Sequence, residues 1–221
     1  MINRHPDPEA LVEYTSGAMS LAPSIAVTTH LQFCNTCDGA VESLKHIGGD
    51  LLERADTIPV SEGLLEKVLL GIDTDSGESA SRFNANRNAV DDVGHALPRY
   101  LRRLLPEGNL RWKFLSPSLR IATVSVGEDK YELALHRIKA GGKAPEHNHN
   151  GQEITVVLTG TFSDEGGIYQ PGDFVVREPG DVHRPIAAQN EECLCLSVLA
   201  APIKLTGMKR LVNPFLSFSP S

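Results

Sequence analysis

The chain has 221 residues, of which 41% are hydrophobic and 22% are charged, and this composition is typical of a globular protein. No stretch approaches the roughly 18 consecutive apolar residues of a membrane helix, the N-terminus has no apolar signal segment, and four cysteines are too few for a disulfide scaffold. We therefore expect a cytoplasmic protein with one large domain or two small ones.

The formal net charge of −7 lies entirely within residues 1–90, which hold 6 basic and 13 acidic residues, whereas residues 91–221 hold 15 of each. A protein that binds nucleic acid directly needs a basic surface, so this distribution argues against such binding. An acidic half suits a basic protein partner, or is simply the solvated surface of a helical region.

Three helices are predicted in the first third of the chain. Asp7 is a suitable N-cap for a helix over residues 8–17, which has proline at its first position and glycine at its end. A second helix is expected from about residue 20 to the glycine pair at 48–49, and a third, with an apolar face, over residues 61–71. The polar residues 74–88, rich in serine, asparagine and glycine, form a predicted linker.

After residue 97 the sequence changes to short runs of strand-forming residues, separated by turn signals that combine glycine with proline or aspartate. The predicted strands cover residues 121–126, 131–138, 153–158, 173–176 and 193–199. Short strands at this spacing indicate a sandwich or a barrel.

A candidate metal site lies in the predicted second helix. His30, Cys34 and Cys37 stand at positions i, i+4 and i+7, so their side chains are expected on one helix face. One imidazole and two thiolates are three of the four ligands of a tetrahedral structural zinc site. The fourth ligand must come from elsewhere. His5, just before the first helix, is the natural candidate, and His46, about four turns beyond His30, is its competitor.

These three residues occupy the middle of an apolar stripe that also contains Val27, Val41 and Leu44. A small helical region has a thin core, which a bound metal would stabilise. Two alternatives compete with a metal site. The cysteines and the histidine can be ordinary buried residues, or the cysteines can form a redox pair, which normally follows a strand that is not predicted here.

The pattern HxxxCxxC with an upstream histidine, over about residues 1–75, resembles the zinc-binding anti-sigma domain of bacterial anti-sigma factors. The resemblance implies that the zinc ligands are His5, His30, Cys34 and Cys37.

A second candidate metal site lies in the β half. His147 and His149 are two residues apart on an extended segment, so both point to the same side, and Glu153 follows a short turn. This segment resembles the first motif of cupins, and residues 171–183 resemble the second, which ends in His183. The resemblance implies that these four side chains converge on a metal inside a jelly-roll barrel. Such a set suits zinc, iron(II), manganese or nickel; the alternative is a metal-free cupin with polar interior histidines.

The expected fold class is α+β with two domains, a small zinc-stabilised helical bundle followed by a cupin β-barrel. The expected boundaries are 1–75 for the helical domain, 76–96 for the linker, 97–201 for the cupin domain and 202–221 for a C-terminal tail. Because the linker is long and polar, we expect the two domains to fold independently and to communicate through a contact that a signal can change.

Cys193 and Cys195 alternate on a predicted strand, so both face the same side, and they are either small core residues or a redox sensor near the barrel site. His95 and His136 belong to no motif and are interpreted as structural or surface residues.

An anti-sigma zinc domain followed by a cupin resembles the ChrR family, and the resemblance spans almost the whole chain. It implies a cytoplasmic anti-sigma factor that inhibits an extracytoplasmic-function (ECF) sigma factor by hiding surfaces that RNA polymerase needs. It also implies release on an oxidant signal of the singlet-oxygen type, sensed by the cupin domain through its metal or through a small-molecule or oxidant ligand. Neither catalysis, nor direct nucleic-acid binding, nor a membrane is expected.

The main alternative is a metal-dependent cupin enzyme, such as a dioxygenase, hydrolase or isomerase, with an N-terminal zinc-binding extension. The barrel ligands alone support catalysis when a coordination position is open. The N-terminal His-Cys-Cys pattern argues against an enzyme, because a metabolic cupin does not need it. A zinc-stabilised DNA-binding regulator is disfavoured by the acidic helical half.

Overall fold

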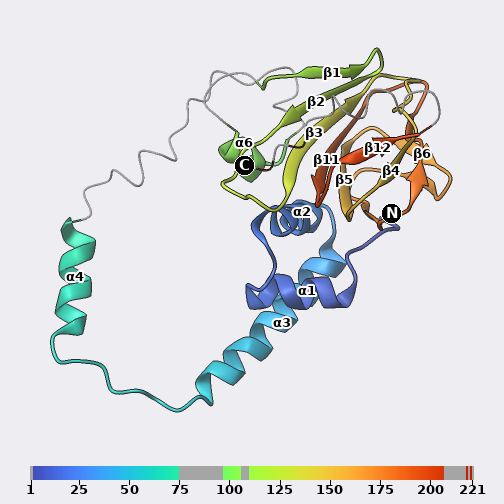
Figure 1. Cartoon of the computed structure of the whole chain (residues 1–221). Coiled ribbons are helices and arrows are strands. Elements are labelled where there is room, and N and C mark those ends of the chain that lie inside the picture. The colour runs from blue at the N-terminus through green and yellow to red at the C-terminus, as the bar shows by residue number, and fades with distance from the viewer. Residues whose placement is uncertain (1, 75–96, 106–109, 207–217, 219, 221) are drawn as a thin grey trace.

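The computed structural model describes residues 2–74, 97–105, 110–206, 218 and 220 (Figure 1). A helical N-terminal region is followed by a β domain, which confirms the expected fold class. The linker predicted at 76–96 lies outside the described residues. Among the described helices, none combines the length and the apolar character that crossing a membrane requires.

The first predicted helix is confirmed as α1 (Pro8–Ser16). Its first turn is capped by Asp7, whose carboxylate accepts a hydrogen bond from the amide of Ala10 at 2.7 Å. Gly17 ends the helix with a φ of 75°, a left-handed conformation that glycine adopts without steric cost.

The predicted second helix is wrong as a single element. The structure has two helices there, α2 (Leu21–Leu31) and α3 (Asn35–Glu53), separated by a turn at residues 32–34. The amides of Phe33 and Cys34 both bond to the carbonyl oxygen of His30, at 2.9 and 3.1 Å, and Cys34 then adopts an extended conformation as the N-cap of α3. The glycine pair at 48–49 does not end α3, because a glycine in a helix costs about 1 kcal/mol but keeps its backbone hydrogen bonds.

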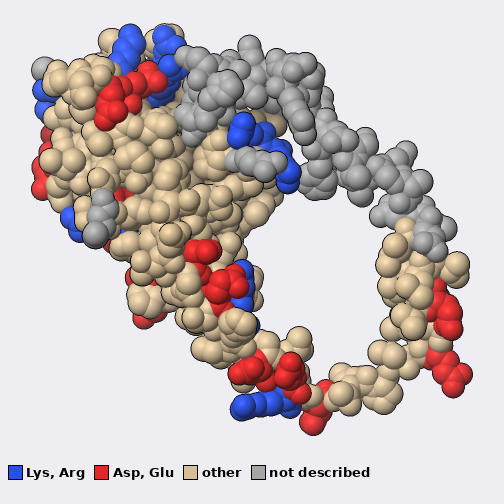
Figure 2. All heavy atoms as spheres, turned by 180° about the vertical axis from the view of Figure 1, so that it is seen from behind, with Lys and Arg blue, Asp and Glu red and all other residues tan. Residues whose placement is uncertain are grey.

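Helix α4 (Leu64–Thr74) confirms the third predicted helix, and it stands apart from the rest of the described chain (Figure 1). Its apolar side chains are exposed, as Leu65 (69%) and Ile72 (65%) illustrate, and so are Ile47 and Leu52 on the second half of α3. We call residues 47–74 the exposed arm. It carries six acidic and two basic residues, and Figure 2 shows red carboxylates spaced along a largely uncharged surface.

The β domain begins with a short helix that the sequence analysis did not predict, α6 (Arg99–Leu104). Each of the five predicted strands overlaps an observed one, and seven further strands, all four residues or shorter, were not predicted. The strands are β1 (Lys113–Ser116), β2 (Leu119–Thr123), β3 (Glu132–Ile138), β4 (His147–His149), β5 (Glu153–Thr159), β6 (Phe162–Asp164), β7 (Gly167–Tyr169), β8 (Phe174–Arg177), β9 (Val182–His183), β10 (Ile186–Ala187), β11 (Cys193–Leu199) and β12 (Ile203–Leu205).

The described strands form a six-stranded sheet in the order β1-β2-β3-β11-β5-β8 and two three-stranded sheets, β10-β6-β7 and β12-β4-β9. The inner face of the large sheet packs against the small sheets, since Val157 of β5 and Phe162 of β6 share one core. Strand β12 pairs with β4, so the β domain extends past residue 201, where the tail was expected to begin.

Helix α2 covers the outer face of the large sheet, next to β5 and β11 (Figure 1). Ala22, Ala26 and Val27 of α2 are fully buried and belong to the same apolar core as Leu194 and Leu196 of β11. Burying one large aliphatic side chain contributes about 1.5–3 kcal/mol, so the helices and the sheet stabilise each other. An isolated helical fragment would expose this face of α2, and we therefore revise the expectation that the helical domain folds independently.

Candidate metal sites

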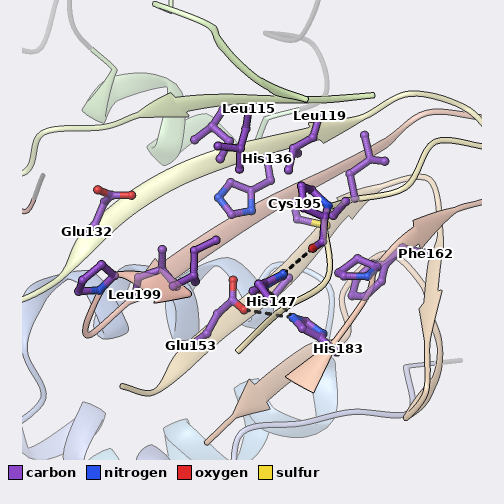
Figure 3. Close-up of a pocket in the computed structure, with 18 of the residues that line it drawn as sticks. Leu115, Leu119, Glu132, His136, His147, Glu153, Phe162, His183, Cys195 and Leu199 are labelled. Carbon is purple, nitrogen blue, oxygen red and sulfur yellow. Dashed lines mark hydrogen bonds and ion pairs between the residues drawn. The ribbon is translucent and has the colours of Figure 1, made fainter. Parts of the chain in front are cut away.

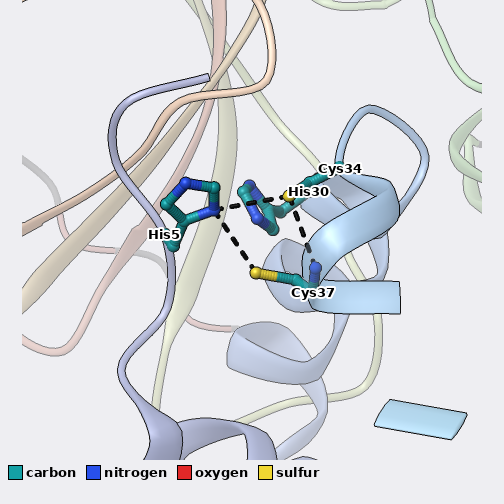
Figure 4. Close-up of side chains that lie close together, drawn as sticks. All are labelled: His5, His30, Cys34 and Cys37. Carbon is teal, nitrogen blue, oxygen red and sulfur yellow. Dashed lines mark hydrogen bonds between the residues drawn. The ribbon is translucent and has the colours of Figure 1, made fainter. Parts of the chain in front are cut away.

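The N-terminal candidate site lies where the segment before α1 meets the turn between α2 and α3 (Figure 4). Nδ1 of His5 lies 3.3 Å from Sγ of Cys34 and 3.4 Å from Sγ of Cys37. With His30, the four candidate ligand atoms all lie within 4.8 Å of one another. Ligands of a tetrahedral zinc ion are separated by about 3.5 Å, so the group can hold one. His46 is exposed on α3 and lies outside this group.

The ring of His30 is fixed by the β domain. Its Nδ1 lies 2.6 Å from the carbonyl oxygen of Gly172, to which it donates, and its Nε2 is buried without a hydrogen-bond partner among the described residues. Burial lowers the pKa of His30, so the ring is neutral and Nε2 carries a lone pair. A buried nitrogen without a partner is costly, and a metal ion at the centre of the group would satisfy it.

The break between α2 and α3 positions both thiols. Cys34 is the N-cap of α3, Cys37 lies in its first turn, and both are buried. Burial and the neighbouring Cys34 raise the pKa of Cys37 to about 12, so the thiol keeps its proton until a metal replaces it.

The segment that carries His5 is attached to the β domain by its backbone. The amides of Asn3 and Arg4 donate to Oδ1 of Asp173, at 2.8 and 3.1 Å, and the amide of Phe174 donates to the carbonyl oxygen of Arg4 at 3.0 Å. Asp173 is fully buried and also accepts a hydrogen bond from the amide of Gln170. The position of His5 therefore depends on a turn of the β domain.

Gly172 allows this close approach. Its φ is 92°, and a Cβ atom there would lie 2.7 Å from Cβ of Phe33 and 2.7 Å from a methyl group of Ile2. Only glycine combines that conformation with that contact.

The second candidate site lies inside the barrel, at the meeting of β4, β5 and β9 (Figure 3). Nε2 of His147 and Nε2 of His183 are 3.0 Å apart, because the two residues pair across β4 and β9. Oε2 of Glu153 lies 3.4 Å from Nε2 of His149 and 3.7 Å from Nε2 of His183. All four side chains are buried, and their ligand atoms lie within 4.8 Å of one another, the arrangement that the resemblance to cupins implies.

The protonation states in the barrel suit a cation. Burial raises the pKa of Glu153, but the surrounding histidines outweigh burial and lower the pKa to about 2. Burial lowers the pKa of His149 to about 4, so its ring is neutral at pH 7. Ser197 donates to Oε1 of Glu153 at 2.6 Å, which leaves Oε2 directed at the histidines.

A buried carboxylate that the sequence analysis missed orients His183. Nδ1 of His183 donates to Oδ2 of Asp164 at 2.8 Å, which leaves Nε2 free to face the group. Arg177 donates to the same carboxylate at 2.6 Å, and Tyr169 donates at 3.0 Å. Burial raises the pKa of Asp164, but the hydrogen bonds from His183 and Arg177 outweigh it and hold the pKa well below its usual range. No local motif marks Asp164, because its role depends on three strands meeting.

Cys193 and Cys195 point into the barrel, with their sulfur atoms 3.6 Å apart. The neighbouring Cys193 thiol and burial raise the pKa of Cys195 well above its usual value. A buried thiol that keeps its proton is a poor nucleophile, so this chemistry favours core residues over a redox sensor. His136 lines the barrel interior, and His95 lies outside the described residues.

Comparison with known proteins identifies the family. The model of the ChrR cupin-like domain matches residues 103–201. Over 215 residues the chain is 30% identical to the anti-sigma-E factor ChrR of Cereibacter sphaeroides, a match that covers 97% of this chain and 98% of that protein. The chain belongs to the ChrR family. The crystal structure of Rhodobacter sphaeroides SigE in complex with the anti-sigma ChrR matches with a TM-score of 0.75 and 29% identity, covering 90% of this chain and 100% of that one.

The region matched by the ChrR cupin-like domain contains all four residues of the barrel group. The N-terminal group lies outside that region, and its members His30, Cys34 and Cys37 lie within the part of the chain that the full-length ChrR match covers.

Proposed function

We propose that this ChrR-family chain is a cytoplasmic anti-sigma factor that binds an ECF sigma factor and keeps it from RNA polymerase. The observation that carries the proposal is the match to an anti-sigma factor over 97% of the chain. A cupin enzyme with an N-terminal extension would be expected to resemble its relatives in the barrel alone, whereas this match also covers the helices.

The exposed arm is the surface that we assign to the sigma factor. It presents apolar side chains of α4 that nothing in the described chain buries, and exposed apolar surface of this extent marks an interaction site. An amphipathic helix that lays its apolar side chains into a groove of a partner is a common mode of recognition. The acidic residues along the arm would guide a basic partner toward it.

We assign zinc to His5, His30, Cys34 and Cys37, because two thiols with two imidazoles are a typical closed structural zinc site. We assign a divalent cation, either zinc or one of iron, manganese and nickel, to His147, His149, Glu153 and His183. The first metal would hold the turn between α2 and α3 against the segment before α1, and the second would organise the barrel interior.

We further propose that the cupin domain senses an oxidant of the singlet-oxygen type and thereby releases the sigma factor. Two contacts support a path from the barrel to the N-terminal site: Gly172 accepts from His30, and Arg4, next to His5, donates to the carbonyl oxygen of Gly166 at 3.2 Å. Gly166 in turn donates its amide to Asp164, which orients His183.

The function is tested by co-expressing the full chain with each ECF sigma factor of the same genome and isolating complexes by size-exclusion chromatography. We expect one stable complex that blocks transcription by that sigma factor in vitro. The absence of any complex would contradict the proposal.

The Leu65→Asp variant tests the assignment of the arm. We expect roughly 30-fold weaker binding, because an apolar interface side chain at a hot spot contributes about 2 kcal/mol. The matched control is Ile168→Asp, which places the same charge on another exposed apolar residue (76%), on β7. Equal affinities of the two variants would place the sigma-binding surface elsewhere.

The Asp164→Asn variant tests the barrel site. The carboxylate accepts from His183 and Arg177 on one oxygen and from the Gly166 amide and Tyr169 on the other, whereas the uncharged amide of asparagine has a single acceptor oxygen. The ring of His183 therefore loses its fixed orientation, and we expect 10- to 100-fold weaker metal binding, about the effect of losing such an outer partner. Competition with a chromophoric chelator measures the affinity. Glu165→Gln is the control, since this neighbouring carboxylate is exposed and lies outside the group. Unchanged affinity in Asp164→Asn would remove Asp164 from the site.

A further inference from the structure

The barrel encloses a cavity of about 110 Å³ beside the candidate metal group. A single water needs about 10–15 Å³, so the cavity has room for a small organic molecule. His147, Glu153 and His183 contribute to one wall, and apolar side chains form most of the rest (Figure 3). The apolar lining includes Leu115, Leu119, Ile121, Ile138, Phe162 and Leu199.

One polar side chain that lines the cavity lies outside the metal group. His136 lies on β3 and lines the cavity, and its Nε2 is buried with no hydrogen-bond partner among the residues that the structure describes. In Figure 3 its ring lies next to Cys195, and Glu153 and His147 lie below it in this view. A buried polar atom without a partner costs about 1–3 kcal/mol, which a bound ligand would offset.

The candidate metal group determines where a negative charge is favoured in the cavity. Three neutral imidazoles and the carboxylate of Glu153 would leave one net positive charge on a bound divalent cation. A second carboxylate, that of Glu132, also lines the cavity, and Glu132 pairs with Leu199 across β3 and β11 (Figure 3). An anionic group of a ligand is therefore favoured beside the metal group.

We propose that this cavity binds a small monocarboxylate with an apolar body, whose carboxylate faces the metal group and His136 and whose hydrocarbon part lies among the apolar side chains. Pockets of this type, with apolar walls and a few convergent polar groups, are typical small-molecule sites. The proposal rests on the barrel metal site of the proposed function and names the class of ligand that this site takes.

The cavity and α2 lie on opposite faces of the large sheet. Strands β3, β5 and β11 carry His136, Glu153 and Cys195 on the inner face, and their alternate residues, such as Leu135 and Leu196, belong to the core shared with α2. A ligand in the cavity is therefore separated by one sheet from α2, which carries His30 in its last turn.

The test is calorimetric titration of the metal-loaded full chain with hexanoate, acetate and 1-hexanol. Four additional methylene groups are worth about 0.8 kcal/mol each, so hexanoate is expected to bind more than about a hundredfold tighter than acetate. Without the charge, hexanol is expected to bind about tenfold weaker than hexanoate. If hexanoate does not bind, or binds no more tightly than either of the other two compounds, the proposal is overturned.

Two variants locate the ligand. Leu115→Trp fills the cavity and is expected to weaken hexanoate binding at least about tenfold, whereas Phe114→Trp, at the neighbouring exposed position (65%), leaves it unchanged. His136→Leu replaces the polar ring by an apolar side chain of similar size and is expected to weaken binding about tenfold at unchanged metal content. If Leu115→Trp does not fold, as judged by its metal content, His136→Leu decides alone, and unchanged binding in that variant contradicts the proposal.

The sigma factor complex is measured on the same wild-type protein. An intact complex without hexanoate binding overturns the ligand alone, whereas the absence of a complex contradicts the proposed function and leaves the titration as a separate result.

Discussion

Replacing Cys34 and Cys37 together by alanine is expected to remove one of two metal ions per chain and to cut the free energy of unfolding by about 4 kcal/mol when free zinc exceeds its dissociation constant a thousandfold. The reason is that the proposed metal would join three parts of the chain, the segment before α1, the end of α2 and the start of α3, and only the folded chain brings them together. Metal analysis and urea unfolding of the full chain measure the two effects.

The control uses the other two cysteines. Cys193→Ala with Cys195→Ala removes the same atoms from a buried pair that lies outside both metal groups. We expect this control variant to keep both metals. Its free energy of unfolding should fall by about 1 kcal/mol per replaced cysteine, because each replacement leaves a small cavity. If the Cys34 and Cys37 variant kept two metals, or lost no more stability than the control, the zinc assignment would be wrong.

Asp173→Ala is expected to lower the free energy of unfolding by about 3 kcal/mol. The carboxylate is fully buried and accepts three backbone amides, those of Asn3, Arg4 and Gln170, and each buried donor left without a partner costs about 1–3 kcal/mol. Because this carboxylate attaches the segment that carries His5, the variant should also exchange the amide hydrogens of residues 2–5 faster. Denaturant unfolding and hydrogen exchange by mass spectrometry provide the two readouts.

Asp181→Ala is the matched control, since this exposed aspartate accepts a single turn amide, that of Glu178 at 2.9 Å. We expect it to cost less than about 1 kcal/mol. Equal losses in the two variants would mean that Asp173 does not hold the N-terminal segment in place.

The two candidate metal groups could be predicted from the sequence because ligand chemistry restricts residue types, local geometry restricts spacing, and the resemblance to known motifs completed each set. His147 and His149 lie on one side of an extended segment whatever surrounds them. The prediction of one continuous helix through Cys34 was wrong, yet the thiols still meet, because Cys34 caps α3 and Cys37 follows one turn later. The choice of His5 over His46 also agrees with the structure, since a ligand before α1 can return to the start of α3.

What surrounds these groups was decided only by the tertiary structure. Asp173 contacts residues 169 and 170 positions away along the chain, and His30 donates to Gly172, 142 positions away. Contacts of this kind leave no periodicity in a single sequence, because either partner alone is an ordinary surface-type aspartate or a turn glycine. The placement of α2 on the sheet has the same origin: its apolar face is visible in the sequence, but an apolar face does not specify which surface covers it. Local chemistry in the sequence therefore indicated the two candidate metal groups, and packing between distant segments decided that both belong to one connected structure.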